Sequence, residues 1–231
     1  PTEGADIDSD ASINIRYPND GDTTYYGQMK AVFPAGDLAV TVKLGVGVAS
    51  ETIAMKAGET VDKDIIVGVG HVVANAFYVP GSRVDDSGLS VDVFKAAKKI
   101  DGSREQVSYG FGPDTKYDLP PGEYAIVAKM DQAIGESLVT VKTGERSDVS
   151  VVLNAGVLAI SAPGATFIEV FSASKDIQGN RKAFGYAYNE NHQTTLPAGD
   201  YVVSVERGDD RVKSEAPATV KAGERSEIAV P

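Results

Sequence analysis

The chain contains no cysteine. This absence excludes disulfides, thiolate metal sites and cysteine nucleophiles together. No apolar run is long enough to span a bilayer, and the residues that follow Pro1 do not resemble a signal peptide. We therefore expect no direct insertion into a membrane, and the abrupt start at Pro1 favours an excised part of a longer protein.

Positive charge is also scarce. The chain has 22 Lys and Arg against 33 Asp and Glu, which gives a formal net charge of −11. An acidic surface repels both a phosphate backbone and an anionic membrane, so nucleic acid and membrane are disfavoured as partners. Many protein surfaces are acidic, however, and the charge alone does not identify a partner.

One turn occurs three times in the chain. Residues 33–42, 119–127 and 196–205 each contain an apolar residue, a Pro-x-Gly-acid turn and then a run of mostly apolar residues. Proline fixes φ at the second position of a turn and glycine allows a positive φ. Each copy therefore predicts a tight turn that leads directly into a strand.

A second motif, Lys-x-Gly-Glu, follows each of these turns. Its glycine comes 22 residues after the turn glycine in the first two copies (36 to 58, 122 to 144) and 24 residues after it in the third (199 to 223). Its glutamate recurs as Glu59, Glu145 and Glu224. A catalytic residue need not appear three times, so we expect these glutamates to stabilise turns.

The motifs divide the chain into three repeats, residues 1–68, 69–154 and 155–231. The second and third repeats match at a constant offset of 77 residues from Val91 to Tyr124, which indicates duplication. Apolar residues alternate with polar ones in short runs, and no stretch has a sustained helical period. The predicted fold class is all-β, with three tandem small antiparallel β-sandwiches, transthyretin-like or immunoglobulin-like, and no substantial helix.

Repeat 1 differs at its beginning. Opening strands are predicted at residues 72–77 and 157–162, but none precedes Ile13, where residues 5–10 are expected to be irregular. A sandwich that lacks an edge strand again favours a chain cut from a longer protein. Residues 61–67 are predicted to form the last strand of repeat 1.

Three connecting stretches are predicted to be irregular. Residues 95–99 are expected to be a loop, because the equivalent residues 172–176 are not helical, and residues 78–88 are expected to be a surface loop. Residues 154–156 join repeats 2 and 3 with almost no linker, which predicts a fixed angle between them.

The residues of the repeats resemble a known family. Residues 161–170, 196–201 and 220–224 look like the PEGA domains of bacterial surface proteins. They are also similar to transthyretin-like sandwiches, namely carboxypeptidase regulatory domains and the B-type repeats of collagen adhesins. The three repeats together resemble the C-terminal tails that follow von Willebrand factor A domains in some proteobacterial proteins. The resemblance covers nearly the whole chain and implies a fold, but very little about activity.

The resemblance to adhesin repeats implies one feature that can be checked. Those repeats often form a lysine–asparagine isopeptide bond, with the lysine on the first strand. The predicted opening strands contain no lysine, so we expect no such bond.

Two aromatic pairs are candidate ligand-binding residues. Tyr109 and Phe111 are two residues apart, as are Tyr186 and Tyr188, so each pair shares one face of its strand. On an exposed face these rings could stack on sugars, as in a carbohydrate-binding module. Alternatively the rings are buried in the core or pack against side chains of neighbouring strands, which is the commoner role of aromatic residues in strands.

Other candidate sites are weaker. Asp6, Asp8 and Asp10 occupy alternate positions, as calcium-binding loops also do, but the glycine and glutamate of an EF-hand are absent. The alternative is a solvated acidic segment. His71 and His192 occupy non-equivalent positions, no Gly-x-Ser-x-Gly motif accompanies them, and we interpret both as surface histidines.

We therefore expect a non-catalytic structural or interaction segment with no cofactor. It would act as a spacer or stalk of a periplasmic, cell-envelope or extracellular protein, although a chain without cysteine fits the cytoplasm equally well. Its partner would be another protein or a covalently attached upstream domain, and its oligomeric state is open. A carbohydrate-binding module is the first alternative, and a hydrolase site between repeats is a distant third.

Overall fold

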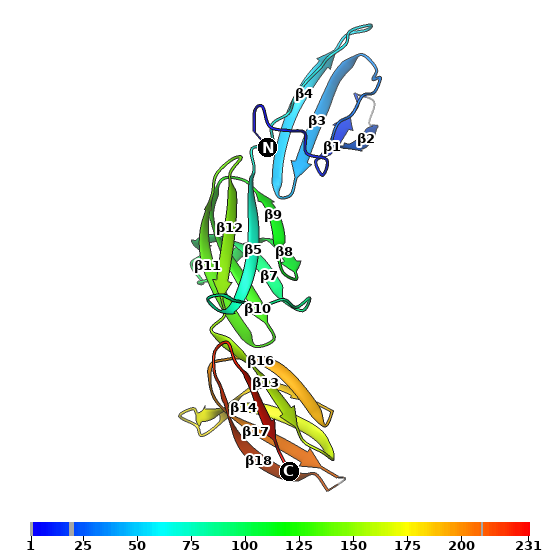
Figure 1. Cartoon of the computed structure of the whole chain (residues 1–231). Coiled ribbons are helices and arrows are strands. Elements are labelled where there is room, and N and C mark those ends of the chain that lie inside the picture. The colour runs from blue at the N-terminus through cyan, green and yellow to red at the C-terminus, as the bar shows by residue number, and fades with distance from the viewer. Residues whose placement is uncertain (1, 19–20, 209) are drawn as a thin grey trace.

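The computed structural model describes residues 2–18, 21–208 and 210–231, and there it contains nineteen strands and no helix. The predicted all-β fold class is therefore confirmed. The strands form three units that follow one another along the length of the molecule (Figure 1). The described residues contain no helix that is long and apolar enough to cross a membrane.

Repeat 2 is a complete two-sheet sandwich. One sheet has the order β11-β10-β7-β8, and the other has the order β12-β5-β6, with β9 also paired to β5. Side chains from both sheets, such as Val72, Val91 and Ile126, are fully buried between them. The strands are β5 (Gly70–Val79), β6 (Ser82–Arg83), β7 (Ser90–Lys98), β8 (Arg104–Phe111), β9 (Thr115–Leu119), β10 (Gly122–Met130), β11 (Ala133–Val141) and β12 (Arg146–Val152).

Repeat 3 has the same plan. Its sheets have the orders β15-β14-β17-β18 and β16-β13-β19. In both repeats the opening strand pairs parallel with the last strand, β5 with β12 and β13 with β19, whereas the other pairs are antiparallel. The strands are β13 (Ala155–Ser161), β14 (Ala165–Lys175), β15 (Arg181–Ala187), β16 (Asn191–Pro197), β17 (Gly199–Arg207), β18 (Val212–Val220) and β19 (Arg225–Ala229).

One of the predicted loops is largely strand, and another contains a short strand pair. β7 continues to Lys98, so the prediction of a loop at residues 95–99 was wrong; a register shift after Phe94 lets the strand extend beyond the core. In residues 78–88, β5 reaches Val79 and pairs with the short β6. Val84 in the same stretch is fully buried, so this segment is anchored to the core.

Repeat 1 forms a single sheet among the described residues. Its order is β2-β1-β3-β4, built from β1 (Ser12–Arg16), β2 (Asp22–Tyr26), β3 (Gly36–Leu44) and β4 (Gly47–Met55). No described residue before β1 is in a strand, as predicted. The predicted strand at residues 61–67 was wrong, because this stretch is irregular.

The missing opening strand is not an edge strand, in contrast to our prediction. In repeat 2 the opening strand β5 lies between β9 and β12, and in repeat 3 β13 lies between β16 and β19. A central strand provides hydrogen-bond partners on both sides. Its absence from repeat 1 explains why residues 61–67 do not become a strand.

The repeated Pro-x-Gly turn is closed by a tyrosine. Tyr124 Oη donates a hydrogen bond to the Pro120 carbonyl at 2.9 Å, and Tyr201 Oη donates to the Pro197 carbonyl at 2.7 Å. Both rings are buried, and burial raises the pKa of Tyr201. Repeat 1 has Leu38 at this position, so its turn lacks the bond.

Candidate functional site

The junction between repeats 2 and 3 is a reciprocal contact between a hairpin turn and a strand. The β10–β11 turn places Asp131 at a φ of +50°. Its carboxylate accepts a hydrogen bond from the Thr195 N–H at 2.7 Å, and the Gln132 N–H donates to the Thr195 carbonyl at 3.2 Å. One turn therefore satisfies both backbone groups of a residue in β16.

The junction between repeats 1 and 2 uses the same positions. In the β3–β4 turn, Gly45 has a φ of +56°, and the Val46 N–H donates to the Asp118 carbonyl in β9 at 2.9 Å. Gly45 and Asp131 both lie nine residues after a turn glycine, at 36 and 122. Asp118 and Thr195 differ by the repeat offset of 77. The contact therefore belongs to the repeat and is made twice.

Glycine is required at the first junction by space as well as by φ. A Cβ on Gly45 would lie 2.4 Å from the Asp118 carbonyl oxygen. Residues with a side chain rarely adopt this φ, and no backbone atom can approach a Cβ so closely. The hydrogen bond made by this turn thus uses backbone groups alone, whereas the turn at the second junction adds the Asp131 carboxylate.

Further contacts support the second junction. The linker between β12 and β13 is only Leu153 and Asn154, and the Asn154 carbonyl accepts a bond from the Ala198 N–H at 3.0 Å. Val79 of repeat 2 packs so tightly over Gly223 of repeat 3 that a Cβ there would lie 2.7 Å from the valine side chain. Such a short and bonded linker restricts rotation between the repeats.

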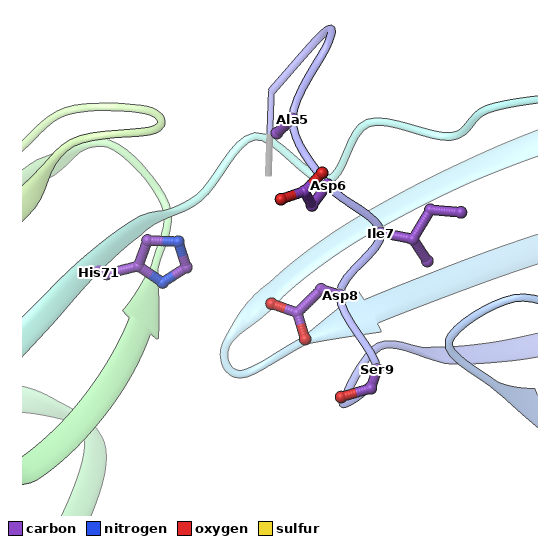
Figure 2. Close-up of a pocket in the computed structure, with 6 residues that line it drawn as sticks. All are labelled: Ala5, Asp6, Ile7, Asp8, Ser9 and His71. Atoms are coloured by element: carbon purple, nitrogen blue, oxygen red, sulfur yellow. The ribbon is translucent and has the colours of Figure 1, made fainter.

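The first junction also carries an open pocket. Figure 2 shows His71, at the start of β5, across from segment 5–9, with the carboxylates of Asp6 and Asp8 on the side facing the histidine. His71 Nδ1 donates to Asp118 Oδ1 at 2.5 Å, so the imidazole is held by the junction residue itself. Ser9 also lines the pocket, but no hydrogen bond joins it to His71 among the described residues. The arrangement therefore lacks the contact of a nucleophile with its base.

The three predicted calcium ligands are only partly brought together. Asp6 and Asp8 line this pocket, whereas Asp10 does not. The Asp8 carboxylate accepts a hydrogen bond from the Asp10 N–H at 2.9 Å, which is a local turn contact. No group of three or more His, Cys, Asp or Glu side chains in the described ranges could hold a metal ion. The calcium site remains a prediction from sequence.

His192 lies at the second junction, in β16. Its Nε2 atom is enclosed and has no hydrogen-bond partner in the described structure. Burial lowers the pKa of His192, and the nearby Asp131 carboxylate opposes this effect. The prediction of a surface histidine was therefore wrong for His192.

The four predicted platform residues are all exposed, three of them on outer sheet faces and Tyr188 just beyond the end of β15. Tyr109, Phe111, Tyr186 and Tyr188 are 68%, 67%, 61% and 72% exposed. Tyr109 is the register partner of Asp92, and Tyr186 that of Glu169, both of which alternate with buried residues. The prediction that these rings are buried in the core was wrong, but the cross-strand packing that we predicted with it is observed in repeat 3, where Tyr186 and Tyr188 pack against Phe167 of β14.

Repeat 3 has the larger aromatic surface. Phe167, which our sequence analysis missed, has its ring centroid 5.9 Å from that of Tyr186 and 5.2 Å from that of Tyr188. Its register partner Glu206 forms an ion pair with Lys213 at 2.8 Å. Three rings beside charged groups can present apolar and polar contacts to one ligand.

The recurring glutamates close turns, as expected. In each copy the glutamate N–H donates to the lysine carbonyl three residues before it, with distances of 3.1 to 3.2 Å for Glu59, Glu145 and Glu224. The side chains add exposed ion pairs in repeats 2 and 3, Lys142–Glu145 and Lys221–Glu224. Exposed pairs of this kind contribute little to stability.

The comparisons assign no family to the chain. No protein-family model matches it, and no curated protein matches it in sequence. Similar solved structures include a streptococcal ancillary pilin (10% identity over 97% of this chain and 93% of that one, TM-score 0.38) and the minor pilin GBS52 of Streptococcus agalactiae (14%, 70% and 94%, TM-score 0.36). Another is the Bacillus anthracis TIE protein (14% identity, TM-score 0.29), of which this chain spans about half, 48%, while 99% of this chain is covered. At these scores the likeness carries no argument about function.

Proposed function

We propose that the chain is a non-catalytic structural and interaction segment, a semi-rigid row of small β repeats within a bacterial cell-envelope or extracellular protein. The observation that supports this most directly is the repeated junction, in which the same hairpin turn binds the same strand position of the next repeat. The location rests on the resemblance to PEGA and related surface domains.

The junctions explain how a row of repeats would resist bending. Domains of one chain usually move relative to one another unless their interface is large or tightly linked. At the second junction a two-residue linker acts together with two hydrogen bonds of Thr195, one from the Gln132 N–H and one to the Asp131 carboxylate. Each such hydrogen bond contributes about 1 kcal/mol when it is shielded from water.

An insertion at the second junction tests this proposal. Six Gly and Ser residues inserted between Leu153 and Asn154 should lower the melting temperature of repeat 3, by roughly 4–8 °C for each 1 kcal/mol lost. The matched control is the same insertion after Ile177, a fully exposed turn residue that takes no part in the junction hydrogen bonds. Equal melting temperatures for the junction and control insertions would contradict a stabilising junction.

A carbohydrate-binding role is a second candidate, because the aromatic face of repeat 3 is exposed. We would titrate the chain with soluble cello-, chito- and xylo-oligosaccharides by calorimetry. The double variant Tyr186→Ala/Tyr188→Ala should lose binding, whereas Ile177→Ala, on an exposed turn of the same repeat, should retain it. No heat with any of these sugars would count against this role.

A further inference from the structure

Repeats 2 and 3 show what repeat 1 lacks. In repeat 2 the opening strand β5 pairs antiparallel with β9 and parallel with β12. Its residues Val72, Ala74 and Ala76 are completely buried. The opening strand therefore joins two other strands and also fills the core with aliphatic side chains at alternate positions.

Repeat 1 contains the two flanking stretches without the strand between them. Residues 29–33 correspond to β9 and residues 60–66 to β12, and Val67 corresponds to Leu153 just after β12, counted from the turn glycines at 36 and 122 and at 58 and 144. Met29, Phe33, Ile65 and Val67 from these stretches pack on the same small core. The two stretches that would flank the central strand of a second sheet thus pack on one hydrophobic cluster.

The backbone of both stretches is unpaired. No backbone–backbone hydrogen bond links residues 28–35 or 60–68 to any residue that the structure describes. Unpaired N–H and C=O groups beside a hydrophobic core are a ready site for addition of a strand. In repeat 2 the residues at the equivalent positions form β9 and β12, which are paired with β5 on its two sides.

The core of repeat 1 is correspondingly shallow. It has four buried members, Ile15, Leu38, Val40 and Val42, which keep 2–5% exposure, and ten partly buried side chains surround them. The core of repeat 2 has nineteen buried members and three partly buried ones. Side chains that remain half-buried can still gain stability from added apolar cover.

We propose that repeat 1 takes up an extended strand from a partner protein in the position of the missing opening strand. The strand would run antiparallel to residues 29–33 and parallel to residues 60–67. This inference goes beyond the proposed spacer role and does not depend on it, because it concerns one repeat and not the junctions.

A second copy of this chain offers no suitable strand. The equivalents β5 and β13 are central strands of their own sheets, and releasing either one would unfold a repeat. Segment 2–11 is not in a sheet, but its alternate positions are Asp6, Asp8 and Asp10. With Ala5, Ile7 and Ser9 facing the core, these carboxylates would lie on the outer face beside Asp62 and Asp64, where like charges on neighbouring strands repel. Neither a second copy of the printed sequence nor segment 2–11 therefore suits this position, whereas a strand of opposite charge from a partner protein does.

The flanking residues indicate the chemistry of that donor. Its inward side chains would be small and aliphatic at alternate positions, as in β5. Asp62 and Asp64 are exposed without an ion pair in the described structure, because the nearby Lys63 is bound to Glu51 at 2.6 Å. Lys63 is the repeat 1 equivalent of Val149, which is buried in repeat 2. The aliphatic side chains of the donor would therefore pack mainly against Ile65 and Val67. Lysine or arginine on the outward face of the donor would complement the two aspartates.

A synthetic strand tests the proposal on the full 231-residue chain. The probe is a ten-residue peptide with the sequence of residues 70–79, in which the residues corresponding to His71 and Asn75 are replaced by lysine. Hydrogen exchange should show new protection in residues 28–35 and 60–67 and no change in repeats 2 and 3. A control peptide with aspartate in place of Val72, Ala74 and Ala76 should give no protection.

Charge reversal sharpens the test. The double variant Asp62→Lys/Asp64→Lys changes only exposed side chains and should weaken binding of the lysine peptide roughly two- to fivefold. An affinity unchanged by the reversal would contradict a basic donor.

Two further results would overturn the proposal. One is the absence of protection in both stretches at millimolar peptide. The other is a concentration-dependent dimer that protects the same stretches without peptide, because the occupant would then be a second copy. Either result leaves the scattering and insertion tests of the spacer role unaffected.

Discussion

Repeats 1 and 2 carry the same two turn motifs and a hairpin turn that contacts the next repeat, yet of the two only repeat 2 forms two sheets. The difference is a single central strand. With β5 present, the flanking residues become β9 and β12 and the core closes; without it, the equivalent residues stay irregular and the core stays shallow. The comparison shows that strand formation in the second sheet depends on a partner strand as well as on local sequence.

The largest effect is expected from matched core substitutions. Val203 in repeat 3 and Val40 in repeat 1 occupy equivalent positions after the turn glycine, but Val203 is fully buried and Val40 lies in the shallow core. Val203→Ala should reduce the free energy of unfolding by about 2–3 kcal/mol, from lost burial plus a cavity, and Val40→Ala by about 1 kcal/mol. Denaturation followed by hydrogen exchange in each repeat measures both losses. Equal losses would contradict a difference between the cores.

A substitution at Gly45 compares the two junctions. A Cβ at Gly45 collides with the Asp118 carbonyl, whereas one at Gly68 meets open space at a similarly positive φ of +72°. We expect Gly45→Ala to destabilise the first junction by about 1.5 kcal/mol and Gly68→Ala by about 1 kcal/mol or less. Thermal unfolding of both variants checks this order, and the reverse order would argue against a tight first junction.

Removal of a turn-closing hydroxyl should have a smaller effect. Tyr201→Phe loses the bond to the Pro197 carbonyl and leaves that half-buried acceptor unpaired, at a cost of about 1 kcal/mol to repeat 3. The exposed Tyr26 serves as the control, and Tyr26→Phe should leave the melting temperature unchanged. If Tyr201→Phe is equally silent, the turn does not depend on its tyrosine.

The smallest expected effect is that of His192 on the pH dependence of the stability of repeat 3. Burial lowers the pKa of His192 in the folded state below its unfolded value of about 6.5. The folded state therefore binds fewer protons, so the contribution of His192 is complete above about pH 6.5 and is lost as the pH falls below it. The melting temperature of repeat 3 should drop more between pH 7.5 and 5.5 in the parent chain than in His192→Gln. Identical drops would mean that His192 does not titrate abnormally.

Much of the fold was predictable, because its turns are determined by residues close together in the sequence. Proline and glycine at fixed positions located β3, β10 and β17, and alternating apolar residues located β7 and β14. The outward direction of Tyr109 also follows from alternation, since its register partner Asp92 lies between buried valines.

Other features depend on contacts between distant residues. Residues 61–67 have the composition of a strand and fail to form one for want of a partner, which no local pattern can show. The junction turns were missed because Gly45 and Asp131 are different residues. Their common signal was only their distance from the turn glycine and their tolerance of a positive φ. Phe167 was missed because it pairs with Tyr186 and Tyr188 across strands.

Small-angle scattering of the monomer after size exclusion tests the central claim most directly. Three repeats held end to end, each about 35 Å long, should give a radius of gyration of roughly 30 Å. The two-residue linker and paired turns predict that this value will not change with salt or temperature below the melting transition. A value near 17 Å, expected for a single compact 231-residue globule, would contradict a row of repeats fixed by their junctions.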